Sequence, residues 1–315
     1  MTTVAMISGC LGAAAAGTDA QAQEGVDYAV FEVSRLRCTI GNNNGLGEHR
    51  PWYNGLFNMS SPDQSQTPFV PAYAGFNLEN FYDARPRHPD PAVFFEPRAN
   101  PIEFKRVNAT TAELYQAPTP FYGIESRIRF ELKEPHYIDV AYTCIPRNAD
   151  LAGKFFGVFW ASYINEPLDK SIHFLAGGSS LEHPKWVQFC TQQHDRDSTV
   201  PHESDKTELT FQPGPTCLWN QISPLRYSQP FFYGVFRNMV LIYIFEPNPG
   251  LRFAHSPSGG GPTKADDAYN PAWDFQLVVP DYEVDKEYGF RARIVYKPWV
   301  NRADVIAEVK KYLGD

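Results

Sequence analysis

The sequence predicts an all-β protein, a large antiparallel β-sandwich of the jelly-roll or supersandwich type with one C-terminal helix. Three observations indicate this fold class. More than about ten segments have strand patterns separated by turn residues, 27 prolines leave little room for helices, and aromatic residues make up 15% of the chain. Aromatic side chains suit pleated, half-buried surfaces.

The clearest strand pattern covers residues 124–133, where apolar and polar residues alternate with period two. Such alternation places one row of side chains on a core and the other on a polar face. Residues 136–145 alternate in the same way, and residues 155–164 are apolar on both sides, which is typical of a central strand. Further strand patterns follow at 171–176, 186–193, 207–212, 231–237, 239–246, 273–279 and 288–296.

One helix is expected, at residues 301–313, because Val305, Ile306, Val309, Tyr312 and Leu313 form an apolar stripe. An acidic residue lies near its start, two lysines lie near its end, and a glycine follows, as helix ends prefer.

The first residues differ from the rest and predict an export leader. Residues 1–24 are small and featureless, and Ala20-Gln21-Ala22 fits a signal-peptidase site. Residues 7–10 also resemble a lipoprotein box, which would place a lipid on Cys10; a disordered tail is the third interpretation. We therefore expect an exported protein. Residues 25–315 are expected to form a single sandwich domain, with a loop-rich part at 26–120 packed on a sheet.

Cysteine usage leaves two alternatives open. Without Cys10, the chain has Cys38, Cys144, Cys190 and Cys217, which lie far apart and form no CxxC motif, so a zinc cluster is not expected. An even number in an oxidising compartment favours at least one disulfide. Buried thiols are the alternative, because free cysteine is among the most buried residue types.

Charge and motifs exclude several classes of function. The formal net charge of −8 is unlike the basic footprint of a nucleic-acid binder. No P-loop, Rossmann fingerprint, nucleophile elbow, HExxH or EF-hand motif occurs, and no segment reaches about 18 uninterrupted apolar residues. No cofactor or metal is expected, although the loop oxygens of residues 194–197 make Ca²⁺ an alternative.

The first candidate site lies where segment 186–193 ends in "QQHDRDS". The imidazole of His194 suits general acid–base catalysis because its ordinary pKa lies near neutrality. Asp195 could orient it. A solvated strand end is the competing interpretation, because charged runs at strand ends are common.

The second candidate is the hairpin-like stretch "FWASYINEPLDKSIHFL", residues 159–175. Trp160 would stack on a sugar, Asn165 and Asp169 would contribute polar groups from the turn, and His173 would return on the next strand as a further catalytic group. The alternative places Trp160 in the core and makes the polar residues turn formers.

The third candidate surrounds the aromatic segment 231–245. Arg226 and Arg237 flank it, and an unpaired guanidinium between apolar strands would be costly, so Arg237 should meet a carboxylate of the protein or of an anionic substrate. Tyr233 would stack on a sugar, and His255 lies near the end of a following strand. We expect His194, His173 and Arg237 to converge in one cleft.

These observations favour an exported carbohydrate-active enzyme that cleaves or remodels a glycan, as a hydrolase or lyase, with a histidine acid/base. A non-catalytic glycan-binding or surface-structural protein on the same fold is the main alternative, and a sugar epimerase is a third. The basis is an analogy of architecture, that is, aromatic-rich strands with polar ends.

Overall fold

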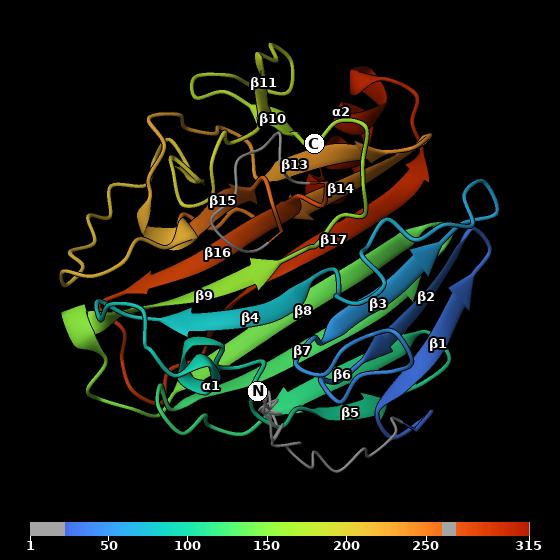
Figure 1. The fold of residues 1–315 in the computed structure, drawn as a ribbon. Coiled ribbons are helices and arrows are strands. Elements are labelled where there is room, and N and C mark those ends of the chain that lie inside the picture. Colours follow the sequence, from blue (N-terminus) through green and yellow to red (C-terminus); the bar gives the residue numbers. More distant parts are fainter. Residues whose placement is uncertain (1–22, 260–268, 315) are drawn as a thin grey trace, which may run out of the picture.

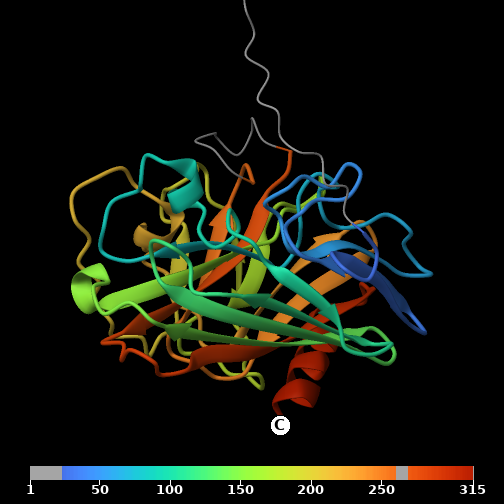
Figure 2. The ribbon, with the colours of Figure 1, turned by 90° about the horizontal axis from the view of Figure 1, so that it is seen from below.

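The computed structural model describes residues 23–259 and 269–314 of the chain. Within these ranges it contains seventeen β-strands, two α-helices and two 3₁₀ turns at Ala152–Lys154 and Leu218–Asn220 (Figure 1). The named strands pair antiparallel and form two stacked layers, with loops gathered on one side (Figure 2). The predicted β-sandwich with one C-terminal helix is therefore confirmed.

One layer is a nine-stranded antiparallel sheet. In spatial order its strands are β11 (Trp186–Phe189), β10 (Ile172–Leu175), β13 (Phe231–Phe236), β14 (Met239–Phe245), β17 (Tyr288–Pro298), β8 (Tyr137–Pro146), β7 (Ile124–Lys133), β6 (Thr111–Gln116) and β5 (Glu103–Arg106).

The opposite layer consists of two sheets. The five-stranded sheet has the order β12 (Thr199–Pro201), β15 (Leu251–Ser256), β16 (Ala272–Pro280), β9 (Phe155–Ala161) and β4 (Asn77–Tyr82). The three-stranded sheet has the order β1 (Tyr28–Val33), β2 (Leu36–Gly41) and β3 (Gly55–Ser60). Leu56 in β3 exchanges backbone hydrogen bonds with Gly75, just before β4, so the two sheets continue one another.

The main hydrophobic core lies between the two layers. Strand β7 buries the side chains of Ile124, Ser126, Ile128, Phe130 and Leu132, as its alternation predicts. Strands β9 and β16 contribute rings from the other layer, and the Trp160 ring stacks on Phe275 with centroids 5.7 Å apart. The opposite face of β9 and β16 is buried as well, under loops.

The N-terminal part differs from the prediction. Residues 26–120 were expected to be one opening strand and long loops, but they contribute the six strands β1 to β6 and the short helix α1 (Pro91–Phe94). Segment 207–212 forms no strand, and β11 ends at Phe189 rather than 193.

The predicted C-terminal helix is α2 (Arg302–Leu313). The side chain of its N-cap residue, Asn301, accepts a hydrogen bond from the backbone of Asp304, and Gly314 ends the helix in the left-handed conformation. Val305 and Val309 pack against the outer face of the nine-stranded sheet. No helix within the described residues is long and apolar enough to cross a membrane.

The structure agrees with one of the two alternatives left open for the cysteines, buried free thiols. Cys38, Cys144, Cys190 and Cys217 are all free, and three of them are buried, which agrees with the buried-thiol alternative. The leader, the signal-peptidase site and Cys10 lie outside the described residues.

Candidate functional site

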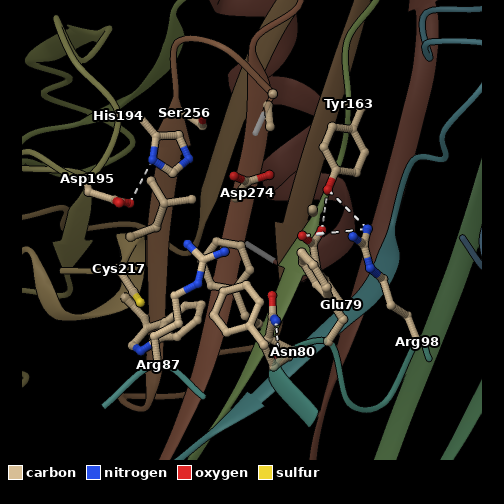
Figure 3. A pocket seen from close by; sticks show the side chains of 18 of the residues that line it. Glu79, Asn80, Arg87, Arg98, Tyr163, His194, Asp195, Cys217, Ser256 and Asp274 are labelled. Carbon is tan, nitrogen blue, oxygen red and sulfur yellow. Dashed lines mark hydrogen bonds and ion pairs between the residues drawn. The ribbon is translucent and has the colours of Figure 1, made fainter. Parts of the chain in front are cut away.

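A pocket of about 600 Å³ opens on the outer face of the five-stranded sheet. Strands β4, β9 and β16 form its floor, and the loops around residues 53–73, 87–98, 194–195 and 215–219 form its walls. Figure 3 shows its charged side chains arranged around Asp274. Its volume falls within the range of about 300–1,000 Å³ typical of small-molecule sites.

A β-bulge in β4 places two consecutive polar side chains in this pocket. The pairing of β4 with β9 shifts between Leu78 and Asn80, so Glu79 is the extra residue. Leu78 and Phe81 point into the core, while Glu79 and Asn80 both line the pocket. Bulges re-aim side chains in this way and are frequent next to active sites.

Asp274 is a fully buried carboxyl group on the floor. It lies on β16, is 1% exposed, and its Oδ1 accepts a hydrogen bond from the backbone N–H of Ser162 at 3.1 Å. Burial raises the pKa of Asp274 well above its usual value, and the nearby charge of Glu79 raises it further, whereas the Ser162 hydrogen bond opposes the shift. Desolvation disfavours the ionised carboxylate. Burial therefore favours the neutral, proton-bearing form of Asp274.

Glu79 belongs to a connected group with Tyr163 and Arg98. The Tyr163 hydroxyl donates to Glu79 Oε2 at 2.6 Å, and Arg98 lies 3.7 Å from Glu79 Oε1. The Arg98 guanidinium is stacked between two rings, 4.3 Å from the Tyr53 centroid and 3.9 Å from that of Phe95. This sandwich fixes its plane. Its buried Nε has no hydrogen-bond partner among the described residues and lies at the pocket wall.

His194 and Asp195 line the opposite side of the pocket (Figure 3). Their side chains are 13% and 19% exposed, and His194 Nδ1 lies 2.9 Å from Asp195 Oδ1. Both Asp195 and Asp197 have left-handed backbones, with φ of 58° and 50°, which form a tight turn after β11. Aspartate tolerates this conformation better than most residues. The turn directs His194 and Asp195 over the pocket, whereas Gln192, Gln193, Arg196 and Asp197 remain exposed to solvent.

Aromatic rings line the remaining wall. Tyr53, Tyr73 and Phe94 are half-buried, so each keeps exposed surface, and Trp219 stacks on Tyr82 with centroids 4.9 Å apart. Cys217 lies beside Trp219, and burial raises the pKa of its thiol to about 12. The pocket thus combines apolar faces with a few convergent polar groups, as small-molecule sites do.

The structure buries two of the aromatic residues that were expected to bind sugar. Trp160 is 0% exposed and faces the core between the layers, because residues of β9 alternate between the core and the pocket. Tyr233 is 2% exposed and is covered by His173 and Trp299, whose ring centroids lie 4.9 and 5.5 Å away. Neither ring has a face open to a ligand, which corrects the expected stacking.

His255 and Arg237 are also corrected. His255 is fully buried, with Nδ1 2.9 Å from the Thr191 hydroxyl and Nε2 2.9 Å from the Lys170 carbonyl, so both ring nitrogens are occupied internally. Arg237 is exposed in the β13–β14 turn, with a left-handed φ of 58°, and lies over its neighbour Phe236. No carboxylate of the described residues pairs with it. The apolar strands separate at a tight hairpin, which leaves the guanidinium in water.

The other predicted residues lie away from the pocket. His173 on β10 lies 3.2 Å from Asp169, and Gln188 also donates to that carboxylate. Asn165 is in the turn after β9, where its backbone bonds to Pro68, and Arg226 donates to nearby carbonyl groups. None of these residues lines the pocket. The expected convergence of His194, His173 and Arg237 is therefore not observed, and only His194 and Asp195 lie there.

Comparisons with known proteins give structural similarity alone. No family model matches the chain, and no curated protein does. A putative aldose 1-epimerase from Escherichia coli K12 is similar with a TM-score of 0.48 and 9% identity, over 87% of this chain and 100% of that one. A GalM/aldose epimerase homologue from C. elegans has a TM-score of 0.42 and 9% identity over the same shares. A 4-alpha-glucanotransferase from Thermococcus litoralis has a TM-score of 0.36 and 12% identity, over 86% of this chain and 39% of that one.

Proposed function

We propose that the protein is a carbohydrate-active enzyme that binds a small sugar in the pocket and transfers protons to its ring oxygen and from its anomeric hydroxyl. The observation that carries this proposal is the buried carboxyl of Asp274, which lines the same pocket as the imidazole of His194 and whose pKa is raised by its burial. Two titratable groups in different environments are the usual signature of an acid and a base. Half-buried aromatic rings next to carboxylate, amide and guanidinium groups match the mixed apolar and hydroxyl surface of a sugar.

In the proposed mechanism Asp274 donates its proton to the ring oxygen of the sugar as the bond from that oxygen to the anomeric carbon breaks. His194 accepts the proton of the anomeric hydroxyl, which becomes the carbonyl of the open-chain aldehyde. Rotation about the first carbon–carbon bond and the reverse proton transfers close the ring with the other configuration. Asp195, 2.9 Å from His194 Nδ1, stabilises the imidazolium that forms.

Glycoside cleavage is the second candidate reaction, and the pair Asp274 and Glu79 favours it. The two residues lie on β16 and β4, which are separated by β9. Two strand spacings are roughly 10 Å between backbones, and glycosidases hold their two carboxyl groups about 5–10 Å apart. However, the negative charge of Glu79 is balanced by Arg98, and its Oε2 accepts a hydrogen bond from Tyr163. Both contacts weaken Glu79 as a nucleophile or base. Interconversion of free sugar anomers needs no second carboxylate and is therefore our first choice.

The test combines two activity screens on the purified protein. Anomer exchange of a monosaccharide panel is followed by polarimetry, and glycan cleavage is followed by reducing ends and by absorbance of unsaturated products. Asp274→Asn and His194→Ala should each lower turnover by about 10²-fold or more, the usual contribution of general acid–base catalysis. His173→Ala is the matched control, because this histidine lies outside the pocket.

The same screens distinguish the non-catalytic alternative. Saturable sugar binding without turnover, lost equally in Asp274→Asn and His194→Ala, would indicate a glycan-binding protein. Absence of both binding and turnover across the panel would end the carbohydrate proposal.

We also propose export, on the basis of the leader sequence. Expressed with its native upstream sequence, the mature chain should begin near Gln23 or carry lipid on Cys10. Intact-mass analysis that finds residues 1–22 retained in a cytosolic product would contradict this.

A further inference from the structure

Among the residues that the structure describes, the charged groups of the pocket leave one cation, Arg87, without a carboxylate partner. Glu79 is paired with Arg98, Asp195 lies against His194, and burial favours the uncharged form of Asp274. Arg87 also lines the pocket, and no carboxylate of the described residues lies within ion-pair distance of it. Figure 3 shows its guanidinium extending into the pocket on the side of Cys217, away from Arg98.

The neighbouring carboxylates are engaged elsewhere. Asp83 pairs with Arg85 at 2.5 Å and accepts the backbone N–H of Ala152. Asp90 caps helix α1 by accepting the N–H of Ala92 at 2.9 Å. Arg87 therefore lacks a carboxylate partner among the described residues even though its own segment contains acidic residues. The acids are present in the same segment, and each has another partner.

Packing holds Arg87 in place at the mouth. Its Cζ lies 4.2 Å from the ring centroid of Phe94, so the guanidinium is stacked on an aromatic face. The adjacent Pro86 packs directly on the opposite loop at Gly214. The two residues are so close that a Cβ added at Gly214 would lie 2.3 Å from Pro86 Cβ. Stacking occupies the face of a guanidinium and leaves its in-plane N–H donors free. These donors match the two oxygens of a carboxylate or phosphate.

We propose that Arg87 binds an anionic substituent, a carboxylate or a phosphate, on the sugar that enters the pocket. This inference rests on the proposed function and names its substrate class as acidic sugars. The sugar ring would lie over the floor at Asp274, and its anionic group would reach the mouth, where Arg87 forms a charge-assisted, bidentate contact.

The test is calorimetric binding of matched trios: glucose, glucuronate and glucose 6-phosphate, and the corresponding galactose set. With the wild-type protein at low salt, one anionic member of a trio should bind about tenfold to a hundredfold more tightly than its neutral parent, the range of a charge-assisted contact. Arg87→Gln should remove this preference and keep the affinity for the neutral sugar. Whether the uronate or the phosphate gains identifies the anion.

Arg127→Gln is the matched control. Arg127 is also exposed and stacked on an aromatic ring, 4.8 Å from the Tyr115 centroid, but it lies on the other sheet. Equal affinities for neutral and anionic sugars in the wild type would overturn the role of Arg87 while leaving the proposed function intact. An equal loss of both in Arg87→Gln would assign Arg87 a structural role and also overturn it. Absence of binding to every member would refute the proposed function itself.

Discussion

Replacement of Asp274 by asparagine tests the central element of the site, the neutral buried carboxyl. Asparagine has the same shape and can still accept the hydrogen bond from the Ser162 backbone, so the fold should be retained. It has no titrating proton. The variant therefore separates the protonation of Asp274 from its packing.

The direction of the pKa shift gives the sign of the effect, and linkage gives its upper limit. The pKa of Asp274 is raised in the folded protein above its unfolded value of 3.8, so the folded state binds the proton more tightly. The wild type then has its full stability below the unfolded pKa and loses it as pH rises toward the folded pKa. The loss is about 1.4 kcal/mol per pH unit. Between pH 5 and 7 the wild type should lose up to about 2.7 kcal/mol relative to Asp274→Asn.

The assay is urea unfolding of both proteins at half-unit steps from pH 5 to 7.5. Taking the difference between the proteins cancels the groups they share. Asp139→Asn is a control in which the pKa shift has the opposite sign. Partial burial raises the pKa of Asp139, but hydrogen bonds from Arg293 and Lys133 outweigh burial and lower it. Its stability difference should therefore be flat above about pH 5. Parallel curves for wild type and Asp274→Asn would mean that Asp274 ionises normally, and its role as the acid would be refuted.

Three further outcomes are expected. The pKa of Glu308 is lowered to about 2: partial burial opposes this shift, but His136, Lys297 and Tyr137 outweigh it. The contribution of Glu308 to folding stability is therefore present above pH 4.5 and lost as pH falls toward 2. Glu308→Gln should flatten this acid dependence in thermal melts. Gly157→Ala should destabilise the protein by about 1–3 kcal/mol through overpacking, because the new Cβ would lie 1.9 Å from Tyr82 Cζ; an unchanged melting temperature would contradict the packing. Burial raises the pKa of the Cys144 and Cys217 thiols to about 12, so peptide-mapped alkylation of native protein at pH 8 should spare both and modify the less buried Cys190 first; rapid labelling of Cys217 would contradict its burial.

The sequence predicted the elements whose patterns are regular. Strand β7 alternates without interruption, and helix α2 has both caps and an apolar stripe, so both were found close to their true ends. In β9 the pattern could not show which face was which, because apolar residues lie on both sides. Trp160 was therefore taken for a ligand contact, although it belongs to the core.

The pocket was predicted only in part, for a related reason. His194 and Asp195 were found because polar residues follow a strand directly. Glu79 was missed because the bulge breaks the alternation of "NLENFY", and no residue in this segment indicates a bulge. Arg98 was missed because its position depends on aromatic residues brought together by tertiary packing. Asp274 sits in a strand whose neighbours are almost all apolar, and its protonation follows from burial that only the fold supplies.

The bulge in β4 also affects how this site can change during evolution. Deletion of the single residue at position 79 would leave Asn77, Leu78, Asn80, Phe81 and Tyr82 in regular alternation, with every core residue still facing inward. The pocket would lose the carboxylate of Glu79 while the sheet kept its pairing. One in-frame codon loss could thus convert the site, and one insertion could restore it, without a change of strand register; the loss would also leave the buried Arg98 without its carboxylate partner, so a second change at position 98 should accompany it. Proteins of this architecture can therefore be expected to differ at this position by length as well as by residue type.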